Sequence, residues 1–146
     1  MEAVRASGTS EAPTYEISLY YRRILVPVDG SEHSFKALDL AADFAKRFGS
    51  RLVVVYARPR GHRDQGPIDE ARKRLEARGV VAELKAVEYD PAHGSPATAV
   101  LREAIDGGYD VVIVGAKGRG GIFESNVGSV ALALAANSPT SVFVVR

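Results

Sequence analysis

The sequence predicts an α/β domain in which a parallel β-sheet carries helices on both faces. Short runs of β-branched residues recur along the chain, and each has the length and composition of a strand buried on both sides. Segments with apolar residues at helical spacing lie between these runs, with capping residues at their ends. Strands that alternate with helices in this way pair in parallel. The chain has 146 residues, which is enough for one domain with a sizeable core.

The first half of the chain contains two predicted strands and two predicted helices. The run RILVPVD, residues 23–29, predicts a buried strand, and Ser31 is placed to cap the helix that follows. Apolar residues at helical spacing continue to Gly49, which ends this helix. The run RLVVVYA, residues 51–57, predicts the second strand. A loop and a short charged helix follow, and Gly79 ends this second helix.

The second half repeats the alternation. Residues 80–87 alternate between apolar and polar side chains, which favours a strand at an edge of the sheet. Ser95 and Pro96 have the residue types of a helix cap and a first helical position. The helix that begins there has an apolar stripe made of Ala97, Val100, Leu101, Ala104 and Ile105. The remaining predicted elements are strands at 110–114 and 141–145 and a helix at 129–137.

Composition and charge exclude several classes of protein. The formal net charge of +1 argues against bulk attraction to nucleic acid or to an anionic membrane. The chain has no cysteine, which excludes disulfides, thiol catalysis and zinc–thiolate sites. No apolar run approaches the roughly 20 residues of a membrane span. Residues 1–21 are polar and lack the apolar core of a secretory signal, so we expect a mobile tail before a domain at 22–146, and a cytoplasmic protein.

The stretch GAKGRGGIFESNVGS, residues 115–129, follows a predicted strand and precedes a predicted helix. Glycines let bare backbone N–H groups approach a ligand, and Gly128 and Ser129 stand where the positive end of a helix dipole is expected. Lys117 adds a positive charge. The stretch matches neither a Walker A loop nor G-x-G-x-x-G. The residues alone therefore leave open a phosphate site and a simple flexible connection.

A glycine motif and three further segments resemble the universal stress protein family. Gly115, Gly118 and the pair Gly128–Ser129 fit that family's motif G-2x-G-9x-G-[ST]. The segments RILVPVDGSEHSFKAL and PTSVFVV are similar to its opening and closing segments, and GSPATAVLREAIDGGYDVVIVG is similar to its third helix and fourth strand. The likeness covers residues 22–146.

This resemblance implies a three-layer α/β/α domain with a five-stranded parallel sheet of order 3-2-1-4-5, like that of adenine nucleotide alpha hydrolases. It also implies a homodimer joined through the last strand, Ser141 to Val145. The glycine motif is typical of the branch of the family that binds ATP. The implied ligands are therefore ATP, or ADP or AMP, with Mg²⁺ beside the phosphates.

Carried over by position, the resemblance implies a site at the carboxyl ends of the strands. Its members would be Pro27, Val28 and Asp29 at the adenosine end, Ala57 at the adenine edge, Val114 and Gly115 at the ribose, and Lys117, Gly118, Gly128, Ser129 and Val130 around the phosphates. Asp29 has a second interpretation, as a cap for the helix behind it. Arg58 and Arg60 follow the second strand and are candidates to reach a phosphate.

We therefore expect an ATP-binding, dimeric, nucleotide-responsive module without nucleic-acid or membrane partners. Two alternatives remain. One is a slow ATPase or autokinase, although the sequence contains no evident catalytic residue and no spacing of metal ligands. The other is a partner-binding module with an impaired nucleotide site. Glu124 favours the latter because it stands where the family often has a cation, and Ala131 stands where a hydroxyl often follows.

Overall fold

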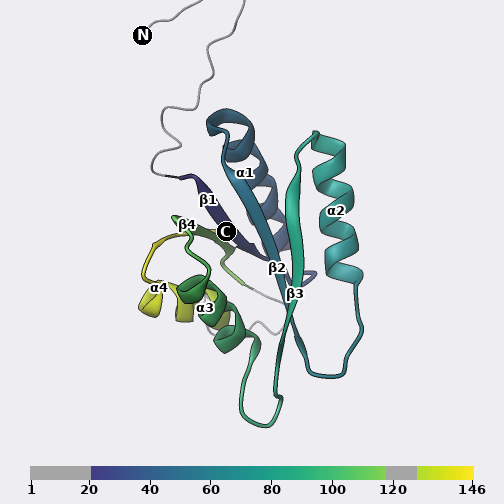
Figure 1. Cartoon of the computed structure of the whole chain (residues 1–146), viewed down its shortest axis with the longest axis vertical. Helices are drawn as coiled ribbons and strands as arrows, with labels where there is room; N and C mark the ends of the chain where they lie inside the picture. Colours follow the sequence, from purple (N-terminus) through teal and green to yellow (C-terminus); the bar gives the residue numbers. More distant parts are fainter. Residues whose placement is uncertain (1–20, 118–127) are drawn as a thin grey trace, which may run out of the picture.

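The computed structural model describes residues 21–117 and 128–146. Strands and helices alternate along this part of the chain (Figure 1). The strands are β1 (Arg23–Pro27), β2 (Arg51–Pro59), β3 (Ala82–Tyr89), β4 (Val111–Gly115) and β5 (Ser141–Val145). The helices are α1 (Glu32–Phe48), α2 (Gly66–Arg78), α3 (Pro96–Asp106) and α4 (Ser129–Asn137).

The five strands form one parallel sheet in the order β3-β2-β1-β4-β5. Helices α1 and α2 pack on one face, and α3 and α4 pack on the other (Figure 1). The three-layer α/β/α fold and its strand order are therefore confirmed. The winding direction reverses between β1 and β4, and in open α/β sheets ligands bind beyond the carboxyl ends of the strands at such a point.

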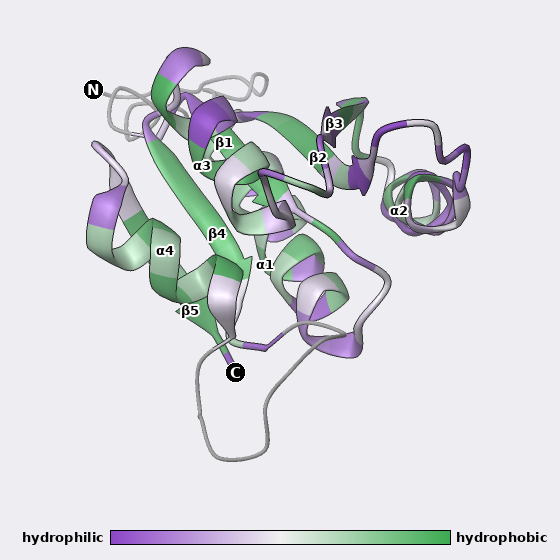
Figure 2. Ribbon diagram, turned by 90° about the horizontal axis from the view of Figure 1, so that it is seen from below, coloured by the Kyte–Doolittle hydropathy of each residue, from purple (hydrophilic) through white to green (hydrophobic). Residues whose placement is uncertain are grey.

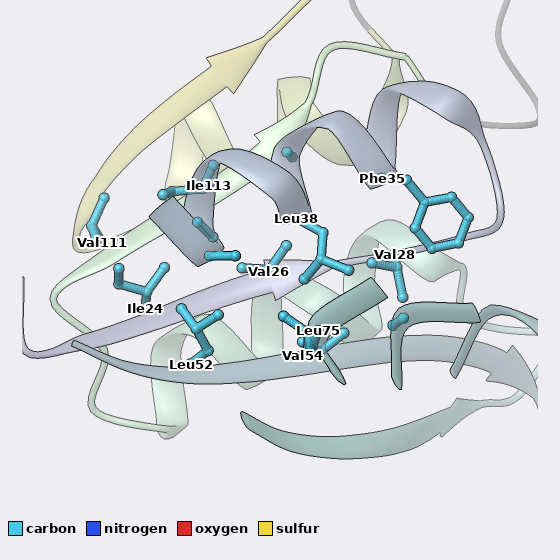
Figure 3. Packing of buried hydrophobic residues seen from close by; sticks show 14 residues of the cluster. Ile24, Val26, Val28, Phe35, Leu38, Leu52, Val54, Leu75, Val111 and Ile113 are labelled. Atoms are coloured by element: carbon cyan, nitrogen blue, oxygen red, sulfur yellow. The ribbon is translucent and has the colours of Figure 1, made fainter. Parts of the chain in front are cut away.

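Two apolar cores hold the layers together. On one face, Ile24 and Val26 of β1 pack beneath Leu38 of α1, and all three side chains are fully buried (Figure 3). Burial of each such side chain contributes about 1.5–3 kcal/mol. On the other face, Leu25 and Val112 lie under α3 and α4. In Figure 2 the strands are mainly hydrophobic and lie between the helices, of which α4 is itself largely hydrophobic.

The predicted helix ends are confirmed. Ser31 Oγ accepts a hydrogen bond from the backbone N–H of Ser34, and Gly49 ends α1 with φ 69°. Ser95 caps α3 through the backbone N–H of Thr98, whose hydroxyl accepts from the backbone N–H of Ser95 in return.

Several details differ from the prediction, of which four have a clear physical reason. β1 ends at Pro27 rather than at residue 29, because the chain turns there towards α1. β2 continues to Pro59, because β3 pairs with it along that length. β3 begins at Ala82, since Val81 is 92% exposed and lies in the turn before the strand. Ile105 is 54% exposed, because Val100 and Ala104 are the residues of α3 that face the core.

The predicted tail lies outside the described residues except for Tyr21. The Tyr21 ring packs against Phe44 of α1 and Phe143 of β5, with ring centroids 6.1 and 6.2 Å away. Within residues 21–117 and 128–146, the helices are all too short or too polar to cross a membrane.

Candidate functional site

A cavity of about 360 Å³ opens at the carboxyl end of the sheet, where the topology predicts a ligand site. Its floor comes from the ends of β1, β2 and β4, and its walls come from the first turns of α1, α3 and α4. The lining consists of Pro27, Val28, Asp29, Ser34, Ala57, Pro96, Val100, Val114, Gly115, Lys117, Gly128, Ser129, Val130 and Ala131. This volume lies within the range of small-molecule sites, roughly 300–1,000 Å³.

Every predicted site residue except Gly118 lines this one cavity, and Gly118 lies outside the described residues. Glu124, which raised the question of an impaired site, lies outside them as well. The sequence prediction missed three lining residues, namely Ser34, Pro96 and Val100, and considered Ala131 only for the hydroxyl that it lacks. The sequence contained a signal for Pro96, because a residue that begins a helix after a strand lies at the carboxyl end of the sheet, where the site was predicted. Val100 was assigned only to the core.

Asp29 and two serines form a compact turn at the start of α1. Asp29 Oδ1 accepts a hydrogen bond from the backbone N–H of Ser31 at 2.9 Å. The Ser34 hydroxyl donates to the backbone carbonyl of Ser31 and accepts from the backbone N–H of Asp29. Ser31, rather than Asp29, caps the helix itself. Asp29 therefore supports the turn while it lines the cavity.

Gly115 allows β4 to pass directly against α1. A Cβ atom at this position would lie 2.5 Å from the carbonyl carbon and oxygen of His33 and 2.8 Å from the nitrogen of Ser34. Side-chain atoms do not approach backbone atoms this closely. Only glycine therefore fits where the carboxyl end of β4 meets the first turn of α1.

The first turn of α4 forms the opposite wall of the cavity. Gly128 is the N-cap residue, and its backbone N–H donates to the carbonyl of Ala116. Among the described residues, none caps this helix end with a side chain. The amides of Ser129 and Val130 precede the first intrahelical bond, from Leu132 N to the Gly128 carbonyl. The positive end of the helix dipole, with Lys117 nearby on the lining, suits an anionic group.

Ala57 brings free backbone groups to the other end of the cavity. The N–H of Val28 donates to the carbonyl of Val55, so the backbone C=O of Val55 points towards β1. Alternate residues of a strand point the same way, so Ala57 directs its N–H and C=O to this side too. The pairing of β1 with β2 ends at Pro27, opposite Val55. The N–H of Ala57, a donor, and its C=O, an acceptor, therefore lie side by side at the cavity.

The two arginines considered for phosphate binding are engaged elsewhere. Arg58 donates from NH1 to the backbone carbonyl of Asp64 and to Gln65 Oε1, which holds the loop before α2. The Arg60 guanidinium lies 3.7 Å from Asp90 Oδ2. Lys117 is thus the one cation that the described part of the chain contributes to the lining.

A charged network fixes the far end of α3. The Tyr109 hydroxyl donates to Glu103 Oε2 at 2.6 Å, and Lys85 Nζ lies 3.0 Å from the same oxygen. Burial acts to raise the pKa of Glu103, but the hydrogen bonds from Tyr109 and Lys85 outweigh it and lower the pKa. Burial, together with the hydrogen bond to Glu103, raises the pKa of Tyr109 to about 12.

The fold and this cavity define a class of parallel α/β domain with a ligand-sized cavity at the carboxyl end of its sheet, and comparison with known proteins narrows the class. The model of the Universal stress protein family matches residues 20–146. A Thermus aquaticus protein, the universal stress protein in QAH/OAS sulfhydrylase 3'region, is 32% identical over 86% of this chain and 99% of its own. The chain therefore belongs to the universal stress protein family.

Solved structures share the fold. Universal stress protein UspA from Lactobacillus plantarum has a TM-score of 0.72 and 22% identity, covering 86% of this chain and 98% of its own. A universal stress protein in complex with cAMP has a TM-score of 0.68 and 26% identity, covering 87% of this chain and 98% of its own. The ligand of the second protein, cAMP, is an adenine nucleotide.

Proposed function

We propose that this chain binds an adenine nucleotide in the cavity at the carboxyl end of the sheet. The observation that carries the proposal is that the two ends of this one cavity offer different hydrogen-bonding groups. Ala57 offers a backbone donor beside an acceptor at one end, and the first turn of α4 offers free amides at the other. Adenine presents an acceptor and an amino donor side by side, and a phosphate suits a helix N-terminus. The relative solved with cAMP supports this ligand class.

Within this class we propose ATP, with ADP and AMP as related ligands. The described lining contains one carboxylate, Asp29, and its Oδ1 is already hydrogen-bonded to a backbone amide. Mg²⁺ commonly takes most of its oxygens from phosphates and water. A Mg²⁺ ion would thus enter with the phosphates, on the side of the cavity where Asp29 lies. The described lining contains no histidine or second carboxylate to activate water, so we propose binding rather than hydrolysis.

Titration calorimetry with AMP, ADP, ATP and GMP tests the ligand. We expect saturable binding of the adenine nucleotides and much weaker binding of GMP, because guanine presents its donor and acceptor in the reverse order. Lys117→Met should weaken binding about tenfold or more, the worth of a hydrogen bond to a charged group. Lys36→Met, at an exposed residue of α1, is the matched control. No binding at millimolar concentrations of adenine nucleotide would overturn the proposal.

We further propose that the protein acts as a homodimer joined through β5. The two edges of the sheet differ: β3 carries Glu83, Lys85 and Glu88, whereas β5, Ser141–Val145, has no charged residue. Charged side chains on an edge strand disfavour its pairing with a strand of another chain, and an edge strand without them favours such pairing. Val144 of β5 is 40% exposed.

Analytical ultracentrifugation tests the dimer. Val144→Lys should convert a dimer to a monomer, because it places a charge on the proposed interface. Val81→Lys, at a side chain that is 92% exposed before β3, should leave the dimer intact. A wild-type monomer at micromolar concentration would contradict this arrangement. The cytoplasm remains the proposed location, and cell fractionation would check it.

A further inference from the structure

Helix α3 forms a wall between two cavities. Pro96 and Val100 face the candidate nucleotide cavity, whereas Thr98 and Arg102 face a second cavity of about 560 Å³ between α3 and the end of β3. Pro96 is also the first residue of the helix. The chain that leads into α3 therefore helps to place Pro96 on the wall of the candidate nucleotide cavity.

That chain is a tight turn organised by Asp90. Its Oδ1 accepts from the backbone N–H of Ala92 at 2.9 Å, and its Oδ2 lies 3.1 Å from Nδ1 of His93. Its backbone carbonyl accepts from the N–H groups of both His93 and Gly94, at 3.0 and 2.7 Å. Arg60 approaches the same carboxylate at 3.7 Å. One residue therefore joins the end of β3, the β2–α2 loop and the turn before α3.

Hydrogen bonds, rather than ion pairs, hold this turn together. The side chains of His93 and Arg60 are 83% and 68% exposed, and ion pairs at such sites contribute little because water screens them. The hydrogen bond with His93, then the one from the Ala92 amide, lowers the pKa of Asp90. Asp90 is thus ionised at neutral pH and accepts at both of its carboxylate oxygens.

We propose that Asp90 is a positioning residue for the nucleotide site, which it does not line: it fixes the turn at 90–94 and, through it, the place of Pro96 on the cavity wall. This inference rests on the proposed function. The Ser95–Thr98 capping box begins α3 but belongs to the helix itself and moves with it. Asp90 ties the chain that leads into the helix to the end of β3, which it follows directly. Loss of the Asp90 carboxylate therefore lets the first turn of α3 shift while the helix stays formed.

The test measures AMP affinity by calorimetry at low temperature, where all variants are folded. Asp90→Ala should bind AMP about five- to tenfold more weakly, which lies within the roughly two- to thirtyfold range of residues that couple to a site without touching it. Asp90→Asn should fall between this variant and wild type, because an amide oxygen still accepts from the Ala92 N–H. Asp106→Ala is the matched control, since it removes a carboxylate that lines the same second cavity but lies at the far end of α3. We expect it to bind like wild type.

Two further readouts separate positioning from a general loss of stability. Hydrogen exchange should quicken in the first turn of α3 in Asp90→Ala and remain unchanged in β4. In a double-mutant cycle with Pro96→Ala, the two effects on affinity should be clearly non-additive, because Asp90 acts through Pro96. Additive effects, or wild-type affinity in Asp90→Ala, would overturn this inference and leave the proposed function standing. A wild-type protein that binds no AMP would instead overturn the proposed function, and this inference with it.

Discussion

Gly115→Ala offers the sharpest test of how the site is built, because the structure fixes what the added methyl group meets. The new Cβ would lie 2.5 Å from two backbone atoms of His33 and 2.8 Å from the nitrogen of Ser34. Carbon atoms in contact stay about 3.5–4.0 Å apart, so β4 and the first turn of α1 must separate by about 1 Å. The neighbours are backbone atoms of a capped helix turn, so no side-chain rotation relieves the contact.

The cost follows from this required shift. Overpacked cores lose typically about 1–3 kcal/mol, and we expect the upper half of that range because the shift involves two backbone segments. For a chain of this size, such a loss lowers the melting temperature by roughly 5–10 °C. The same shift displaces Lys117, whose backbone carbonyl accepts from the Ser31 hydroxyl at 3.5 Å. AMP affinity should therefore fall in the folded variant too.

Chemical denaturation measures this effect, with a shift of the midpoint at constant slope as the signature of lost stability. Gly94→Ala is the matched control: its Cβ would find its nearest atoms at 3.4 Å, an ordinary contact distance. We expect that control to lose less than about 0.5 kcal/mol. Equal stability of the two variants would refute the argument that Gly115 is required by the close approach of α1 and β4.

Three further predictions concern α3 and its surroundings. The pKa of Tyr109 is raised to about 12, so the neutral form of Tyr109 stabilises the folded protein. This contribution to the free energy of unfolding is fully present below pH 10 and falls by roughly 2–3 kcal/mol between pH 10 and 12. Denaturation curves at both pH values check this, and Tyr109→Phe should lack the decline. Glu103→Gln should lose about 1–3 kcal/mol at pH 7, since it weakens the bonds to Tyr109 and Lys85. This loss of stability should vanish in acid, where Glu103 is protonated. A loss that persists in acid would argue against a role for the negative charge of Glu103. Ser95→Ala should cost about 1 kcal/mol in thermal unfolding through the capping box with Thr98, whereas Ser141→Ala at an exposed strand end should cost little.

The sequence predicted the elements well because their signals are local. Ser31, Gly49 and Ser95 mark helix ends through bonds to residues a few positions away. The strands stood out as uninterrupted apolar runs, which a parallel sheet buried on both faces requires. Element ends were less certain: β2 runs on to Pro59 because β3 pairs beside it, and pairing between distant segments leaves no local mark.

The candidate site was predicted in part. Its glycines and Asp29 lie in motifs with fixed spacing, so a family resemblance carried them over. Pro96 and Val100 come from a helix that such motifs do not connect to the site, and they reach it because α3 packs across β2. Likewise, Ile105 fits a helical stripe in the sequence but faces outward, because the direction of packing decides which part of a stripe is buried.

By itself the sequence determined the order of strands and helices, the helix caps and the glycine motif, since each depends on residues near one another in the chain. Only the tertiary structure decided that the ends of β1, β2 and β4 enclose one cavity with the first turns of α1, α3 and α4. It also showed that Gly115 lies against His33, and that the carboxylate of Asp90 fastens the turn before Pro96. These contacts join residues far apart in sequence, and their geometry exists only once the sheet has brought the strand ends together.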